Sequence, residues 1–344
     1  VTRKGAAEQG RVALDAAVEI LPWYNDYFGT SYPLPKLDMI AVPGTSQFFG
    51  AMENWGAIMY FEQALLMDPQ ISSESDRLNI YDAVAHEMAH QWFGNLVTME
   101  WWDDLWLNEG YATWMAEKAA STLRSQWNVP LLTVKWPREF ALQSDASDAT
   151  HPIVQRVASV DAASQAFDAI AYNKGSAVIR MLEASLGETG FRDGIRRYVR
   201  RYAYDNTVTD QLWSELASAT NRPVIDIARD FTLQPGVPLV KAVAGRCESG
   251  RTRVTLTQGR FETGTPSPVA LTWRIPVVLQ AIDSRATAST MLGKDGAPVS
   301  VEVGGCGPVV VNAGQTGYFR TQYADADLTR IRQSLGQIAE VDRL

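Results

Sequence analysis

The chain has 344 residues, of which 46% are hydrophobic and 20% are charged, a composition ordinary for a soluble globular protein long enough for two domains. Its formal net charge is −8, and it lacks the clustered Lys and Arg that phosphate contacts require, which argues against nucleic-acid binding. No run of about 18 apolar residues occurs, so we expect no membrane-spanning segment in this chain. Composition leaves the compartment open between a bacterial-type cytoplasm and a periplasm.

The first part of the chain alternates between helical and strand patterns. Residues 8–28 have apolar positions at helical spacing and are followed by Gly29, which predicts an amphipathic helix. Short strands are expected at 37–42 and 58–61, and the glycines of the intervening segment 50–56 suit close approach of another molecule to the backbone. A helix start is predicted within the polar residues 72–76, and helical spacing continues to about residue 233.

After residue 235 the apolar residues alternate with period two, as in half-buried strands. This pattern predicts a small antiparallel β-sandwich at 236–323. Residues 324–344 return to helical spacing for barely two apolar turns, which we interpret as the start of a truncated C-terminal helical domain. The predicted fold class is α+β, with a mostly helical first domain at 1–235 that includes a small sheet.

Two histidines four residues apart give the strongest chemical signal in the chain. Because residues i and i+4 share one face of a helix, His86 and His90 present two imidazoles to one point, with Glu87 beside them. A catalytic zinc takes three protein ligands and keeps one position for water. Glu109, after eighteen intervening residues, supplies the third donor. The sequence therefore predicts one Zn²⁺ per chain, held by His86, His90 and Glu109.

Glu87 has a different role from the histidines that flank it. It cannot reach the same metal without strain, so it is left to take a proton from the water that zinc activates at neutral pH. We predict that Glu87 is the general base and that it later returns the proton to the leaving amine.

Longer strings of residues carry a resemblance to a known family. These strings are HEMAHQWFGNLVTM at 86–99, WLNEG at 106–110 and GAMENWG at 50–56. Together they resemble the aminopeptidase N and puromycin-sensitive aminopeptidase family of zinc metallopeptidases, the gluzincins. The resemblance implies a thermolysin-like catalytic domain at 1–235 followed by the sandwich. It also implies that the family's N-terminal β-domain and most of its C-terminal helical domain are missing from this chain.

The same resemblance assigns further site residues. It implies that Tyr172 is a catalytic residue whose hydroxyl donates to the oxyanion of the tetrahedral intermediate. It implies that Glu53 binds the free α-amine of the substrate, so that blocked peptides are disfavoured. The resemblance implies that other residues of the glycine-rich segment bind substrate as well, namely Gly50, Ala51, Met52 and Asn54. Gly50 and Ala51 would offer backbone groups to the peptide.

The function expected from these residues is zinc-dependent hydrolysis of the N-terminal bond of peptides with a free N-terminus. One alternative is a gluzincin of other specificity, either an endopeptidase or an epoxide hydrolase. Another is an inactive or weakly active module of the same fold, since the missing N-terminal domain would supply part of the pocket.

The sequence leaves the roles of several polar residues undecided. Asp103, Asp104 or Glu117 could accept a hydrogen bond from a metal-bound imidazole, and the sequence does not choose among them. His151, next to a proline, is expected to have a capping or loop role rather than to bind metal. The two cysteines, Cys247 and Cys306, are compatible with reduced thiols or with one disulfide.

Overall fold

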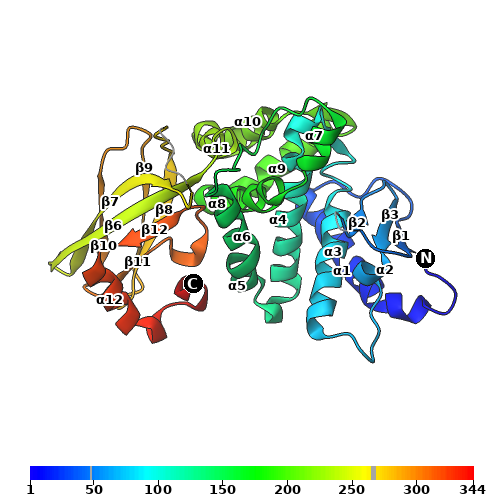
Figure 1. Cartoon of the computed structure of the whole chain (residues 1–344), viewed down its shortest axis with the longest axis horizontal. Coiled ribbons are helices and arrows are strands. Elements are labelled where there is room, and N and C mark those ends of the chain that lie inside the picture. Colours follow the sequence, from blue (N-terminus) through cyan, green and yellow to red (C-terminus); the bar gives the residue numbers. More distant parts are fainter. Residues whose placement is uncertain (47–48, 265–268) are drawn as a thin grey trace. The chain divides into compact units, whose positions relative to one another are not determined.

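A computed structural model describes residues 1–46, 49–264 and 269–344, shown in Figure 1. These residues form two compact units, and each unit is assembled from separate stretches of chain. The first unit contains residues 1–130, 156–166 and 188–221, and the second contains 131–155, 167–187 and 222–344. Helices with small sheets precede a β-rich region, which confirms the predicted α+β class. The domain limits at residues 235 and 323 stay predictions.

The first unit begins with a long helix and a small sheet. Helix α1 (Arg11–Phe28) follows a 3₁₀ turn at Ala7–Gly10 and ends at Gly29, whose φ of 60° suits glycine. Strands β1 (Asp38–Val42), β2 (Ala51–Met52) and β3 (Ala57–Phe61) form a sheet in the order β1-β3-β2. Because β3 is central, β2 pairs along one edge only among the described residues. The short helix α2 (Glu62–Leu65) follows.

Two helices of the first unit carry the predicted metal ligands. Helix α3 (Glu74–Ala89) begins at Ser73, whose side chain accepts from the Asp76 backbone while the Asp76 carboxylate accepts from the Ser73 backbone. Helix α4 (Trp106–Leu123) packs against α3 and is buried over most of its length. Behind them lies an aromatic core, in which the Phe93 and Tyr111 rings stack with centroids 3.5 Å apart. This packing fixes the two helices against each other.

The remaining elements of the first unit surround these helices. Strands β4 (Val97–Met99) and β5 (Asp205–Thr207) pair in parallel. The helices are α7 (Val160–Gln165), α9 (Glu188–Tyr202) and α10 (Thr209–Thr220), with 3₁₀ turns at Trp102–Asp104 and Ser125–Trp127. Helix α5 (Val129–Thr133) follows the second of these turns and contains the passage of the chain from the first unit into the second.

The second unit has a helical part and a β-rich part. The helical part contains α6 (Glu139–Asp145), α8 (Gly175–Leu186) and α11 (Val224–Thr232). A π-helical turn precedes each of the first two, namely η4 (Val134–Arg138) and η5 (Ile170–Lys174). Such turns inside helices are uncommon and are found often at functional sites.

The β-rich part contains two sheets, with strand orders β10-β7-β6-β12 and β11-β8-β9. The strands are β6 (Val237–Glu248), β7 (Arg251–Phe261), β8 (Ile275–Ala281), β9 (Thr287–Leu292), β10 (Val299–Gly304), β11 (Val309–Val311) and β12 (Arg320–Tyr323). Strand β8 buries alternate residues, as the period-two pattern predicts. The pairings are antiparallel except that β12 joins β6 in parallel, which the sequence pattern did not reveal.

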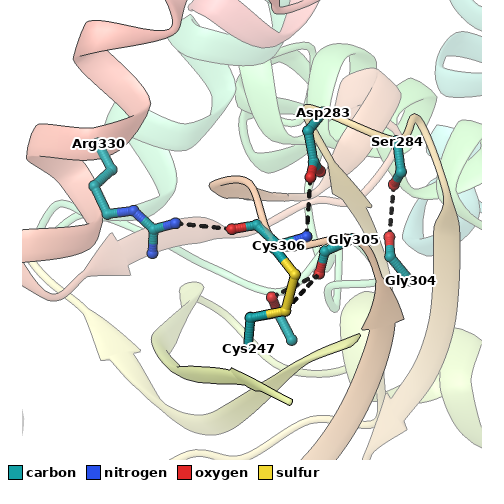
Figure 2. Close-up of a disulfide and its surroundings, with 8 residues drawn as sticks. Cys247, Asp283, Ser284, Gly304, Gly305, Cys306 and Arg330 are labelled. Atoms are coloured by element: carbon teal, nitrogen blue, oxygen red, sulfur yellow. Dashed lines mark hydrogen bonds between the residues drawn. A yellow bond between two sulfur atoms is a disulfide. The ribbon is translucent and has the colours of Figure 1, made fainter. Parts of the chain in front are cut away.

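A disulfide joins Cys247 in β6 to Cys306 in the connection after β10. Of the two possibilities that the sequence left open, reduced thiols or one disulfide, the structure has the disulfide. In Figure 2 the Cys306 backbone N–H donates to the Asp283 carboxylate at 2.9 Å. The Cys306 carbonyl accepts from the Arg330 guanidinium at 3.1 Å. The disulfide therefore links β6 to the β10–β11 connection, and the Arg330 hydrogen bond adds helix α12 (Asp325–Gln333).

After α12 the chain continues through 3₁₀ turns at Leu335–Gln337 and Glu340–Arg343. Among the helices of the described residues, none combines the length and the apolar character needed to cross a membrane.

Candidate active site

The structure brings the three predicted ligands together. His86 lies in the last turn of α3, His90 directly follows that helix, and Glu109 lies in the first turn of α4. The two imidazole Nε2 atoms are 3.0 Å apart. Oε2 of Glu109 lies 3.4 Å from Nε2 of His86 and 3.5 Å from Nε2 of His90. Three donor atoms, from α3, from the residue after it and from α4, thus converge on one point.

These distances fit a tetrahedral zinc site. Metal–ligand bonds of about 2.0–2.1 Å at tetrahedral angles place neighbouring donor atoms roughly 3.3–3.4 Å apart. The observed separations of 3.0–3.5 Å are close to that edge length. Two nitrogens and one carboxylate oxygen are also a donor set that catalytic zinc uses. The residues present therefore fit the group that the sequence predicts.

The orientation of His90 is set by the backbone. Its Nδ1 lies 3.0 Å from the Phe93 carbonyl, which can only accept, so Nδ1 carries the proton and donates it. The lone pair of Nε2 is then free to bind a metal. Asp103 and Asp104 are used elsewhere, because they accept from the backbone N–H groups of Val157 and Thr209, respectively. The hydrogen-bond acceptor for His90 is therefore the Phe93 carbonyl, and not one of the carboxylates that the sequence suggested.

Burial and neighbouring charges shift the pKa values of the residues in the site. Burial lowers the pKa of His90, but the neighbouring Glu109 carboxylate outweighs burial and raises it to about 10. Burial would raise the pKa of Glu109, but the two imidazoles hold it well below its usual range. The site therefore favours positive charge, which a metal ion supplies by displacing a proton.

Glu87 places its carboxylate near His90, and one of its two oxygens has no hydrogen-bond donor among the described residues. The residue is buried, and its Oε2 is a buried oxygen for which the described residues provide no hydrogen-bond partner. Burial raises the pKa of Glu87 to about 8, and a nearby dication would lower it again. A buried carboxylate oxygen left free of protein donors is suited to exchange a proton with a reacting molecule.

Glu53 lies in the same cluster. Ligand atoms of Glu53, Glu87 and His90 are all within 4.8 Å of one another. Glu53 follows β2 and is half-buried. The structure thus places the predicted amine-binding carboxylate beside the predicted base and beside His90, one of the predicted metal ligands.

Two amide side chains that the sequence analysis did not single out hold Glu53 in place. The Glu53 carbonyl accepts from Nδ2 of Asn95 at 2.8 Å and from Nε2 of Gln91 at 3.1 Å. Oε1 of Gln91 accepts from the Gly56 backbone N–H at 3.3 Å. The residues after α3 are therefore hydrogen-bonded directly to the glycine-rich segment. A signal was available in the sequence, since Gln91 is a polar residue at helical spacing from Glu87.

The other residues of the glycine-rich segment lie on or next to β2. Gly50, Met52 and Asn54 are exposed and Ala51 is half-buried. The Gly50 carbonyl accepts from the Phe61 backbone N–H at 2.9 Å, so one of its lone pairs is already used in a backbone hydrogen bond. Their contact with substrate stays a prediction.

Tyr172 lies in η5, within the second unit, and is half-buried. Its action at the metal stays a prediction. Two residues later, the Lys174 ammonium forms an ion pair with Asp145 at 2.9 Å, and both side chains are fully buried. The lysine of the tyrosine motif is therefore a structural residue of the second unit.

Comparisons with known proteins agree with this geometry. Residues 12–231 match the model of the peptidase family M1 domain. The chain belongs to the peptidase M1 family. Rice (Oryza sativa subsp. japonica) aminopeptidase M1-C is 37% identical over 97% of the chain and 38% of its own length. Probable aminopeptidase 2 of Sulfurisphaera tokodaii is 38% identical over 95% of the chain and 40% of its own length.

The puromycin-sensitive aminopeptidase of Caenorhabditis elegans is 36% identical over 95% of the chain and 35% of its own length. This M1 chain therefore spans about two fifths of the length of the curated relatives it matches. Family membership implies zinc, and the group formed by His86, His90 and Glu109 is suited to hold it.

Metal content tests the ligand assignment directly. We expect close to one zinc per chain in protein prepared without chelator, and a large loss in His90→Ala because two ligands do not complete the site. His151→Ala is the matched control, since it removes the one histidine outside the ligand group. Zinc would be measured by atomic emission on purified, folded protein. Equal zinc content in the two variants would contradict the assignment.

Proposed function

We propose that this M1 chain forms the catalytic centre of a zinc aminopeptidase that hydrolyses the N-terminal bond of peptides with a free α-amine. The observation that carries the proposal is the position of the Glu53 and Glu87 carboxylates beside His90, one of the three converging residues. Zinc, when bound by His86, His90 and Glu109, would supply a Lewis acid that activates water at neutral pH.

The residues of the chain divide the remaining work. Glu87 would accept a proton from the attacking water at its unpartnered carboxylate oxygen and deliver it to the leaving amine. Tyr172 would donate its hydroxyl proton in a hydrogen bond to the developing oxyanion. The M1 aminopeptidase relatives support this assignment of roles.

The preference for a free amine follows from charge. With Glu53, Glu87 and Glu109 ionised and both imidazoles neutral, the cluster has a formal charge of minus three. A zinc dication and one substrate ammonium together neutralise it. An acetylated N-terminus brings no charge, so one buried carboxylate would lack a partner, which is costly in a poorly solvated site.

Strand β2 offers a place for the peptide backbone. Among the described residues it pairs with β3 on one side only, and it ends directly before Glu53. Extended peptides bind proteins by adding a strand to such an edge. A peptide that pairs there would have its N-terminus near Glu53, which supports the substrate-binding role proposed for Gly50, Ala51, Met52 and Asn54.

Selectivity for free over acetylated peptides tests the role of Glu53. In wild type we expect kcat/KM for an aminoacyl reporter to exceed that of its acetylated form by at least about 10²-fold, because the acetylated form leaves a charged group unpaired. Glu53→Gln keeps the shape but removes the charge, and Glu53→Ala removes both. Both variants should lose most of this ratio while keeping their zinc, and an unchanged ratio would refute the amine-binding role.

The alternatives give other outcomes in the same assays. Efficient cleavage within blocked peptides would indicate an endopeptidase, and turnover of an epoxide without peptide cleavage would indicate an epoxide hydrolase. Because this chain spans only part of its relatives, we propose weak activity for the 344 residues alone, with greater activity in any longer product of the gene. Zinc binding without turnover in either form would indicate a non-enzymatic module.

A further inference from the structure

His151 is the histidine that the metal site does not use, and the second unit gives it two specific contacts. Its Nε2 lies 2.6 Å from Oδ2 of Asp168, and its Nδ1 lies 2.7 Å from the Pro152 carbonyl. The Asp168 carboxylate and the Pro152 carbonyl are both acceptors, so the imidazolium form of His151, in which both ring nitrogens donate, satisfies both contacts. The side chain is largely buried, with 25% exposed, and so is that of Asp168, with 32% exposed.

Asp168 uses its other carboxylate oxygen to hold the start of η5. Oδ1 accepts from the backbone N–H of Ile170 at 2.9 Å and of Ala171 at 3.0 Å. The Asp168 carbonyl accepts from the backbone N–H of Tyr172 at 3.1 Å. The first N–H groups of a helix have no partner within the helix, and a carboxylate that accepts from them fixes the first turn. A single aspartate thus holds three consecutive residues that end at Tyr172.

The charge of His151 supports this arrangement. The hydrogen bond from His151 to the Asp168 carboxylate raises the pKa of the imidazole, against the opposing effect of burial. Burial would raise the pKa of Asp168, but the imidazolium and the backbone N–H groups together lower it. Each partner therefore favours the charged form of the other.

The far end of η5 is held separately. Lys174, its last residue, pairs with Asp145 in the buried core of the second unit. The turn that carries Tyr172 is therefore fixed by an ion pair at each end, one half-buried and one fully buried. The half-buried pair contacts the first turn directly, so it controls the backbone that leads into Tyr172.

We propose that His151 is a positioning residue, which orients Asp168 so that this carboxylate fixes the first turn of η5 and with it the Tyr172 side chain. The part of this proposal that concerns catalysis rests on the proposed function, because that function gives Tyr172 its catalytic role. The effect of His151 on the backbone of η5 does not depend on that function.

Amide hydrogen exchange tests the backbone step without any assay of activity. In His151→Gln, which keeps a polar side chain but removes the positive charge and places both N–H donors on one nitrogen, the amides of Ile170 and Ala171 should exchange about tenfold faster or more. Amides in β8 should be unchanged and serve as the internal control. His151→Leu should give a larger effect. Unchanged exchange at Ile170 and Ala171 in the folded Gln variant would overturn the proposal.

A double-mutant cycle tests the link to Tyr172. In the zinc-loaded enzyme, His151→Gln should lower kcat about tenfold with KM nearly unchanged, because misplacing a transition-state donor leaves ground-state binding intact. In a Tyr172→Phe background the same substitution should change kcat less than about twofold, since the group that it positions is gone. An equal effect in both backgrounds would show that His151 does not act through Tyr172.

The two ideas fail in different ways. If Tyr172→Phe leaves kcat unchanged, the catalytic role of Tyr172 is wrong, and the exchange rates at Ile170 and Ala171 still decide whether His151 fixes the turn. If Tyr172→Phe is impaired but the cycle is additive, the proposed catalytic role stands and the positioning role is lost.

Discussion

Glu87→Gln should keep close to one zinc per chain and lose about 10³-fold or more in kcat, because the carboxylate is a base and not a ligand. Glu87 lies outside the group His86, His90 and Glu109, but it also forms a second group with Glu53 and His90, so zinc content decides whether it is a ligand. Its buried Oε2 has no partner among the described residues, so the amide of Gln can replace it without breaking a protein hydrogen bond. Zinc content and steady-state kinetics on the same preparation would check both halves.

Glu100→Gln is the matched control for this change. Glu100 lies thirteen residues further along and is exposed, so the same loss of charge should leave kcat within about twofold of wild type. Near-normal kcat in Glu87→Gln would exclude the proposed mechanism. Loss of zinc from Glu87→Gln would instead show that Glu87 helps to hold the metal.

Lys174→Met should lower the free energy of unfolding of the second unit by about 3–5 kcal/mol, because it leaves the buried Asp145 carboxylate without its cation. Asp145 also accepts from the Gly236 backbone N–H at 2.7 Å and from the Tyr318 hydroxyl at 3.1 Å. These neutral donors only partly replace the ammonium. Chemical denaturation followed by circular dichroism and by tryptophan fluorescence would measure the loss.

Lys36→Met provides the comparison. Lys36 pairs with Asp38 at 2.6 Å, but its side chain is 75% exposed, and exposed ion pairs contribute about 0–1 kcal/mol. Both substitutions replace a lysine by methionine, so a difference between their losses in free energy of unfolding reports the effect of burying the ion pair. A loss for Lys174→Met no larger than that for Lys36→Met would contradict the structural role assigned to Lys174.

Local patterns in the sequence predicted the core of the candidate site. His86, Glu87 and His90 lie within five residues, so helical geometry alone places them together. The capped start of α3 and the glycine end of α1 were also predicted, because capping depends on neighbours in the chain. Glu109 was found because the metal requires a third donor and the spacing offered one.

Contacts between distant residues could not be predicted in this way. The hydrogen bonds from Gln91 and Asn95 to Glu53 span 38 and 42 residues, and no local rule specifies them. The pairing of His151 with Asp168 depends on how a loop returns to the start of η5, so the sequence suggested a capping or loop role without naming the partner. The parallel addition of β12 to β6 is likewise decided by topology, since period-two alternation is the same for either strand direction.

The disulfide between Cys247 and Cys306 makes the β-rich region depend on its redox surroundings. It closes a loop between residues 59 apart in sequence, a constraint worth about 4 kcal/mol in the chain-entropy description. Such a bond persists in oxidising compartments and is reduced in most cytosols. Protein made under reducing conditions would carry two thiols beside the Arg330 contact of α12. Its unfolding midpoint would then describe a different covalent molecule from that of protein made under oxidising conditions.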